Sequence, residues 1–183
     1  KRRHGDRPFE VRPIPSAALT DLDRRRFEDE YLPAAFAPDV LSAKERTYEQ
    51  RLAATKMVVA ADDPTPTVLG VLVLTTRARD FIPGAYVQFL RIGGRELADP
   101  ILDEQLIDGP LADVVRRTDE KLNSHNRTAV DFTTGDRERR TSLYPKPALQ
   151  QIVRNAIMHR SYEATNAPVR VTWFDDRIEI MSP

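Results

Sequence analysis

Cysteine is absent from the 183-residue chain, which excludes disulfides, thiolate nucleophiles and cysteine metal ligands together. Histidine is scarce, and His4, His125 and His159 are scattered along the sequence. A site built on histidine ligands is therefore not expected, because zinc and related metals need several such groups close together. We predict no structural metal from this composition.

Net charge and long apolar runs are lacking too. The 28 basic and 28 acidic side chains cancel, so the overall field does not indicate tight nucleic-acid binding, although a local basic strip remains open. No stretch approaches the roughly 18 apolar residues of a membrane-spanning helix. With 31% charged residues, we expect no membrane partner. No signal-peptide pattern opens the chain, so we expect a cytoplasmic protein.

The length suits one soluble domain or two small ones. We expect three regions: an extended segment and helical pair at 1–64, an α+β middle region at 65–142, and a helix with a hairpin at 143–183. The chain begins on a basic, proline-punctuated run and stops directly after an expected strand. We therefore expect a piece of a longer protein, in which an unpaired strand edge favours self-association.

The residue patterns predict an α+β fold with helices packed on a largely antiparallel sheet. A helix is expected at 21–32, ending before Pro33. The almost wholly apolar run at 68–76 predicts a strand at the centre of the sheet. The other expected elements are a helix within 42–60, strands within 85–92 and 99–110, a helix within 110–126, a hairpin with its turn at 134–137, a helix within 146–162 and a hairpin within 168–183.

The stretch QIVRNAIMHRSY, residues 151–162, contains the principal candidate site. Gln151, Asn155 and His159 follow an i, i+4, i+8 line and therefore share one side of a helix. Such a row could line a cleft and offer amide and imidazole groups to phosphate or to a metal-bound water. The alternative, favoured by spacing alone, is that these groups cap loops or face water. The predicted core face comprises Leu149, Ile152, Val153, Ala156 and Ile157.

The stretch YPKPALQQIVRNAIMHRSYEATNAPVRVTWFDDRIEIMSP resembles the C-terminal region of bacterial RecG-related proteins. Those proteins are labelled ATP-dependent DNA helicase or transcriptional regulator, and they typically carry an N-terminal Schlafen-type AlbA domain. RDFIPGAYVQFLRIGG and DGPLADVVRRTDEKL are similar to their middle segment, so the likeness runs from about Arg12 onward. The helicase label is not supported, because the chain has no Gly-x-x-x-x-Gly-Lys-[Ser/Thr] phosphate loop.

The same region also resembles one half of the GHKL ATPase fold of gyrase-B-type proteins and histidine kinases. In that superfamily an Asn holds Mg²⁺, and a Glu four residues earlier activates water. Asn155 matches the Asn, but Gln151 stands at the Glu position, and an amide cannot accept a proton at neutral pH. Ser182 stands where the superfamily has an adenine-binding Asp. The resemblance therefore implies a degenerate ATPase motif without a catalytic residue.

Two hypotheses follow. The leading one is a non-catalytic regulatory or oligomerisation module of a DNA-binding transcriptional regulator, in which the parent protein contacts DNA and this region forms homo-oligomers. The alternative is an ATP-binding domain in which Asn155 holds Mg²⁺ and His159 or Arg160 lies near phosphate. ATP and Mg²⁺ are thus expected only in the intact protein, if at all.

Two further patterns have simpler interpretations. Arg137, Arg139 and Arg140, and likewise the run at 24–26, could contact nucleic-acid phosphates. Neither cluster has interleaved aromatic residues, so solvated charge is the favoured interpretation. The pair Asp175-Asp176 predicts a hairpin turn, because Asp tolerates the backbone dihedral angles found there.

Overall fold

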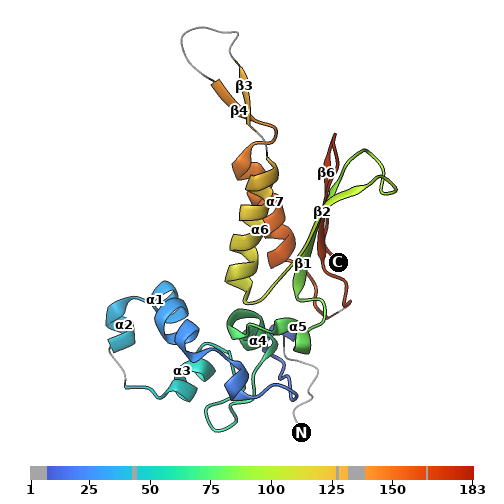
Figure 1. Ribbon diagram of the computed structural model, residues 1–183. Coiled ribbons are helices and arrows are strands. Elements are labelled where there is room, and N and C mark those ends of the chain that lie inside the picture. The colour runs from blue at the N-terminus through green and yellow to red at the C-terminus, as the bar shows by residue number, and fades with distance from the viewer. Residues whose placement is uncertain (1–7, 43–44, 127, 132–138, 164) are drawn as a thin grey trace. The chain divides into compact units, whose positions relative to one another are not determined.

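The computed structural model describes residues 8–42, 45–126, 128–131, 139–163 and 165–183 (Figure 1). The α+β class is confirmed, since helices and a four-stranded sheet are both present. The chain divides into two compact units. Unit 1 contains Lys1–Ala85 with Asp108–Leu111, and unit 2 contains Tyr86–Ile107 with Ala112–Pro183. The boundary after Ala85 falls inside the middle region expected at 65–142.

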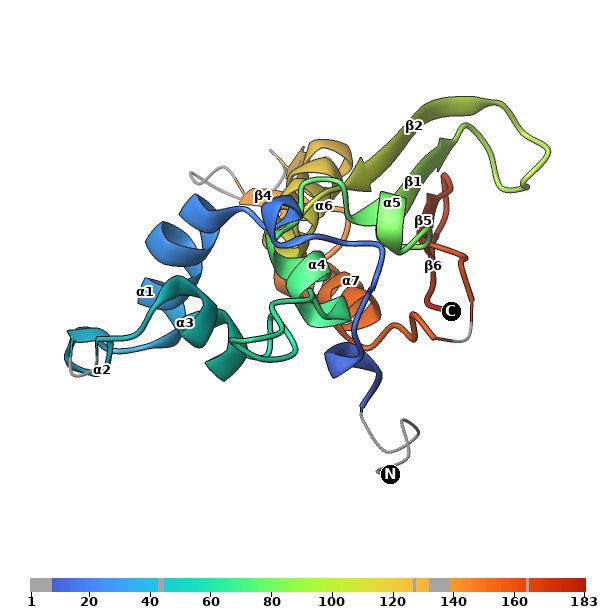
Figure 2. The same ribbon diagram turned by 90° about the horizontal axis from the view of Figure 1, so that it is seen from below.

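Unit 1 is built from short helices around one apolar core. Figures 1 and 2 show α4 followed closely by α5, with α1, α2 and α3 in the other half of the unit. The elements are 3₁₀ turns at Phe9–Val11 and Leu19–Asp21, a π-helical turn at Arg26–Tyr31, α1 (Leu32–Ala35), α2 (Pro38–Ser42), α3 (Tyr48–Ala54), α4 (Val68–Leu74) and α5 (Ala78–Phe81). The core cluster comprises Leu22, Phe27, Leu32, Leu52, Met57, Val58 and Leu74.

The first helix extends further than the sequence predicts. Its start is set by Asp23, whose Oδ1 accepts the backbone N–H of Arg26 at 3.0 Å. The expected end before Pro33 is wrong, because helical structure continues to Ala35. A proline normally clashes with the carbonyl four residues earlier. Here Pro33 lies in the first turn of α1, where a missing N–H is tolerated, directly after a π-helical turn in which the N–H of Leu32 bonds five residues back.

The strand expected at 68–76 is also wrong, because Val68–Leu74 form helix α4. Thr67 caps this helix: its Oγ1 accepts the N–H of Gly70 at 3.1 Å and donates to the carbonyl of Lys56 at 2.7 Å. Gly70 lies against the preceding segment, so closely that a Cβ there would be 2.1 Å from the carbonyl oxygen of Met57. A short, mostly buried apolar run suits a helix or a strand equally, and here the N-cap of Thr67 selects the helix.

Unit 2 contains a mixed sheet with strand order β2-β1-β5-β6. Its strands are β1 (Tyr86–Ile92), β2 (Ile101–Asp108), β5 (Val169–Trp173) and β6 (Ile178–Met181), which confirms the four strands expected in these regions. β1 and β5 are parallel, with Val87 opposite Val169, whereas β5 and β6 are antiparallel. The parallel pair is the part of the topology that hairpin patterns in the sequence do not predict.

Helices α6 (Leu111–His125) and α7 (Lys146–Met158) complete unit 2 at the positions expected for helices. The ring of His125 on α6 stacks on Phe89 of β1, which places that helix on one face of the sheet. α7 buries Leu149, Val153 and Ile157. Between the helices, β3 (Thr128–Asp131) and β4 (Arg139–Ser142) form the expected antiparallel hairpin (Figure 1). Its expected turn at 134–137 lies outside the described residues.

Candidate functional site

The candidate row lies on the exposed side of α7. The buried residues Leu149, Val153 and Ile157 are spaced four apart, and Gln151, Asn155 and His159 repeat the same spacing on an exposed side. The wider core face that the sequence predicts is partly wrong. Ile152 was expected inside but is 56% exposed, because the helix buries only a narrow stripe. The row is therefore accessible over its whole length.

Two neighbouring amides bond to each other in this row. The Nε2 of Gln151 donates to the Oδ1 of Asn155 at 3.0 Å. The pair is exposed, and i,i+4 pairs of this kind stabilise a helix by about 0.2–0.5 kcal/mol. Neither amide takes up a proton at neutral pH. This arrangement can hold a ligand by hydrogen bonds, but it supplies no general base.

His159 marks the end of α7. Its backbone N–H donates to the carbonyl of Asn155 at 2.9 Å, and its side chain is exposed. The imidazole and the Asn155 amide thus belong to the same side of the helix, as their spacing predicts. A ligand that reached this row from solvent would meet both groups.

Arg160 is buried, whereas the preceding residue, His159, is exposed. It is only 6% exposed, and its Nη2 donates to the carbonyl of Thr165 at 3.3 Å and to that of Ala167. The guanidinium also lies 4.3 Å from the ring centroid of Tyr162. Burial lowers the pKa of Arg160 and raises the pKa of Tyr162. Arg160 therefore holds the chain that leads from α7 toward β5.

Ser182 lies against α7. Its Oγ donates to the carbonyl of Ala156 at 2.9 Å, one residue beyond Asn155. The carbonyl of Pro183 accepts the N–H of Ser161 at 3.3 Å. The end of β6 is thus joined to the C-terminal half of the helix. The serine hydroxyl is therefore bonded to the backbone of α7, at the residue that follows Asn155.

The pair Asp175-Asp176 forms the hairpin turn that the sequence predicts. The N–H of Phe174 donates to the carbonyl of Arg177 at 2.9 Å and closes the turn. Arg91 Nη2 lies 2.5 Å from Asp175 Oδ1, and Arg177 Nη1 lies 3.0 Å from Asp176 Oδ1. Both carboxylates are therefore paired with guanidinium groups that hold the turn.

The proposed phosphate contacts around β4 are only partly described. Arg137 lies outside the described residues. Arg139 and Arg140 are placed in β4 by their backbone, and their side chains are not described. Their contact with nucleic acid stays a prediction.

The arginine run at 24–26 is partly neutralised within its own helix. Arg24 pairs with Glu28 at 3.1 Å, and Arg26 pairs with Glu30 at 3.0 Å. The guanidinium of Arg24 also lies 4.8 Å from the ring centroid of Tyr48. These i,i+4 pairs support the interpretation of this run as a charged helix surface.

A second polar cluster, which the sequence interpretation missed, joins β2 to α6. Lys121 Nζ lies 2.5 Å and His125 Nε2 lies 2.8 Å from the same oxygen of Asp103. The hydrogen bond from Lys121, followed by the one from His125, lowers the pKa of Asp103. The i,i+4 spacing of Lys121 and His125 was visible in the sequence. Their common partner was not, because it comes from a strand.

Among the described residues, no group of three His, Asp or Glu side chains could hold a metal ion. The described helices include none with both the length and the apolar character needed to cross a membrane.

Comparison with known proteins relates the chain to a solved structure. No family model and no curated protein matches it. It is similar to the crystal structure of the DIP2311 protein from Corynebacterium diphtheriae, a structural genomics target, with a TM-score of 0.60 and 16% sequence identity. The match covers 97% of this chain and 33% of that protein, so the chain spans about a third of its length. At this identity the likeness shows a shared fold.

Proposed function

We propose that the chain is a non-catalytic regulatory module of a cytoplasmic DNA-binding transcriptional regulator related to RecG-like proteins. The observation that carries this proposal is the bond between Gln151 and Asn155 on the exposed side of α7. A hydrolytic GHKL site needs a carboxylate at the position of Gln151, and an amide there cannot activate water. The motif resemblance described above supports the family assignment.

The chemistry of the row favours binding over turnover. Loss of a general base typically lowers a rate by about 10²–10⁴-fold. Ser182, at the position where adenine recognition needs an Asp, has its hydroxyl bonded to Ala156. The Oδ1 of Asn155 already accepts a bond from Gln151, so the Nδ2 of Asn155 and the imidazole of exposed His159 are the groups that this proposal gives to a ligand. In this proposal the row senses a ligand, and a nucleotide with Mg²⁺ is the alternative occupant.

Self-association is the second part of the proposal. β6 is at one edge of the described sheet, and its Met181 is exposed. An edge strand presents unpaired backbone donors and acceptors that can pair with a second chain. We assign homo-oligomer formation to this edge and DNA contact to the other parts of the parent protein.

Titration calorimetry with Mg·ATP, together with a phosphate-release assay, tests the non-catalytic assignment. We expect no Mg²⁺-dependent phosphate release from the chain or from its full-length parent. Asn155→Ala is the site variant, and Gln150→Ala, an amide on a different side of α7, is the matched control. Phosphate release that Asn155→Ala abolishes and Gln150→Ala preserves would establish an ATPase and overturn the proposal.

Binding without turnover would be informative as well. Mg·ATP binding that is lost only in Asn155→Ala would identify the nucleotide as the sensed ligand and keep the non-catalytic assignment. The oligomeric state is measured separately by analytical ultracentrifugation. A chain that stays monomeric at all concentrations would remove the self-association part of the proposal.

A further inference from the structure

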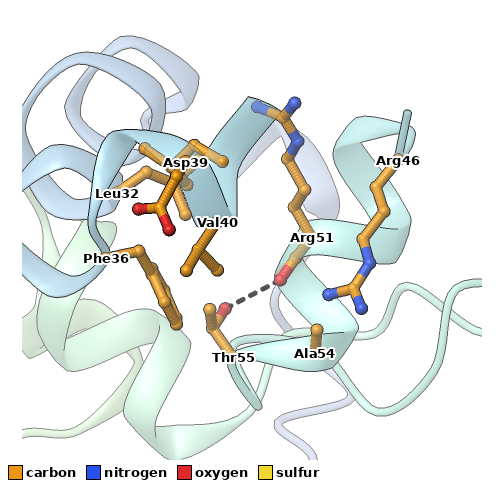
Figure 3. A pocket seen from close by; sticks show the side chains of 9 residues that line it. Leu32, Phe36, Asp39, Val40, Arg46, Arg51, Ala54 and Thr55 are labelled. Atoms are coloured by element: carbon orange, nitrogen blue, oxygen red, sulfur yellow. Dashed lines mark hydrogen bonds between the residues drawn. The ribbon is translucent and has the colours of Figure 1, made fainter. Parts of the chain in front are cut away.

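Unit 1 contains a pocket of about 280 Å³ bordered by α1, α2 and α3 (Figure 3). Leu32 borders it from the core side. Phe36 and Val40 line it as well and lie outside the core cluster of this unit. Val40 is 55% exposed. The pocket thus presents apolar surface that the folded chain leaves in contact with water.

Charge at this pocket is not balanced. Arg46 and Arg51 both line it, together with one carboxylate, Asp39. In the part of the chain that the structure describes, neither guanidinium has a hydrogen bond or an ion pair. By contrast, Arg24 and Arg26 in the same unit are both paired with glutamates. The pocket therefore has excess positive charge beside an apolar surface.

The apolar side chains and the positively charged side chains lie in different parts of the pocket. In Figure 3, Phe36 and Val40 point toward Thr55, and the Arg46 side chain extends toward Ala54 from the opposite side of the pocket to Asp39. The hydroxyl of Thr55 donates to the carbonyls of Arg51 and Leu52 at 3.0 and 3.1 Å. The hydroxyl proton of Thr55 is therefore already shared with backbone carbonyls of α3. Figure 3 shows the Arg51 side chain extending away from Thr55, so Arg46 is the charged donor nearest the apolar lining.

We propose that this pocket binds a small apolar carboxylic acid, such as a medium-chain or aromatic acid. Its hydrocarbon part would cover Phe36 and Val40, which is favourable because apolar surface leaves water. Its carboxylate would pair with the guanidinium group of Arg46, whose forked geometry matches two carboxylate oxygens. The volume lies just below the usual range of about 300–1,000 Å³ for small-molecule pockets, which favours a compact ligand. The proposal concerns unit 1 alone and does not depend on the row of α7.

Calorimetric titration with sodium octanoate tests the proposal, with octan-1-ol as the neutral probe of the same length. We expect octanoate to bind at least about tenfold more tightly, because a hydrogen bond to a charged group is stronger than one to a neutral hydroxyl. The double variant Arg46→Gln/Arg51→Gln should abolish this preference. The control Arg77→Gln removes an exposed positive charge elsewhere in the unit and should preserve it.

A second pair of variants locates the binding site. Ala54→Phe fills the pocket and should abolish octanoate binding, whereas Ala112→Phe, at an exposed position of α6, should leave it unchanged. Circular dichroism melting verifies that each variant is folded, and chemical shifts of the pocket residues on titration of the unmodified chain give an independent location. Equal affinity for octanoate and octanol, octanoate binding that survives Ala54→Phe, or no binding at millimolar octanoate would each overturn the proposal.

Discussion

Arg154 of α7 donates from both Nε and Nη2 to one carboxylate oxygen of Asp119 on α6, with the Nε bond at 3.0 Å. The two residues are 35 positions apart, so the bond joins helices that are distant in sequence. Asp119 is buried, whereas Arg154 is about half exposed. The second carboxylate oxygen of Asp119 is buried and has no hydrogen-bond partner among the described residues. Within that part of the chain, the charge of Asp119 is compensated by the Arg154 guanidinium.

Removal of the guanidinium should destabilise unit 2. We expect Arg154→Met to lower the free energy of unfolding by about 1–3 kcal/mol, because it leaves a buried carboxylate unpaired while the arginine was partly solvated. The matched variant Arg116→Met removes an exposed arginine of α6 and should change it by less than about 0.5 kcal/mol. Urea denaturation measures both. Equal losses in the two variants would show that the bond to Asp119 is unimportant.

The lowered pKa of Asp103 predicts an acid-dependent loss of stability. Hydrogen bonds from Lys121 and His125 stabilise its charged form in the folded chain. A carboxyl group whose folded pKa is lower than its unfolded value contributes stability above the unfolded value of about 3.9, and that contribution is lost as the pH falls through the folded pKa. Asp103→Asn should therefore be less stable than the unmodified chain at pH 7, with a smaller difference below about pH 4.

Urea denaturation across this pH range measures the effect of Asp103→Asn. Asp62→Asn, at an exposed loop position, is the control and should leave the pH dependence of unfolding unchanged. If the deficit of Asp103→Asn were the same at pH 7 and at pH 3, the contribution of the Asp103 charge would be refuted.

Gly70→Ala should destabilise unit 1 although alanine is the better helix former. Propensity alone predicts a gain of about 1 kcal/mol in helix α4. The added Cβ would instead lie 2.1 Å from the carbonyl oxygen of Met57, and overpacking of this kind costs about 1–3 kcal/mol. Thermal melting gives the sign directly. A stabilised Gly70→Ala variant would contradict the close packing of α4 on the segment that contains Met57.

The two sides of α7 should respond differently to truncation. Gln151→Ala removes an exposed amide pair and should reduce stability by no more than about 0.5 kcal/mol. Ile157→Ala removes a buried side chain and should cost about 2–5 kcal/mol. Chemical denaturation compares them. A large loss in Gln151→Ala would show that the row serves the fold of α7, which would weaken its assignment as a ligand-sensing surface.

Local patterns predicted the elements whose own residues determine them. Helix α7 followed from its 3.6-residue period, and the β5–β6 hairpin followed from strand alternation around Asp175-Asp176. Helix α4 did not, because an apolar run specifies burial more strongly than conformation, and the decisive contact of Gly70 with Met57 is tertiary. The parallel pairing of β1 with β5 joins residues 82 positions apart, and no local pattern records such a pairing.

In the candidate site too, the features set by local spacing were predictable, and those set by tertiary contacts were not. The exposed row of Gln151, Asn155 and His159 followed from spacing on one helix. The burial of Arg160 did not, because the carbonyls of Thr165 and Ala167 that accept its hydrogen bonds are brought to it by the path of the chain after α7. An arginine is expected at the surface unless such partners are known.

The bond between Ser182 and the carbonyl of Ala156 couples the end of β6 to helix α7. A ligand that shifted the helix would also shift the strand at which a second copy is proposed to pair. If the ligand preferred one position of α7, its binding would change the assembly constant. By thermodynamic reciprocity, assembly would then change the ligand affinity by the same factor.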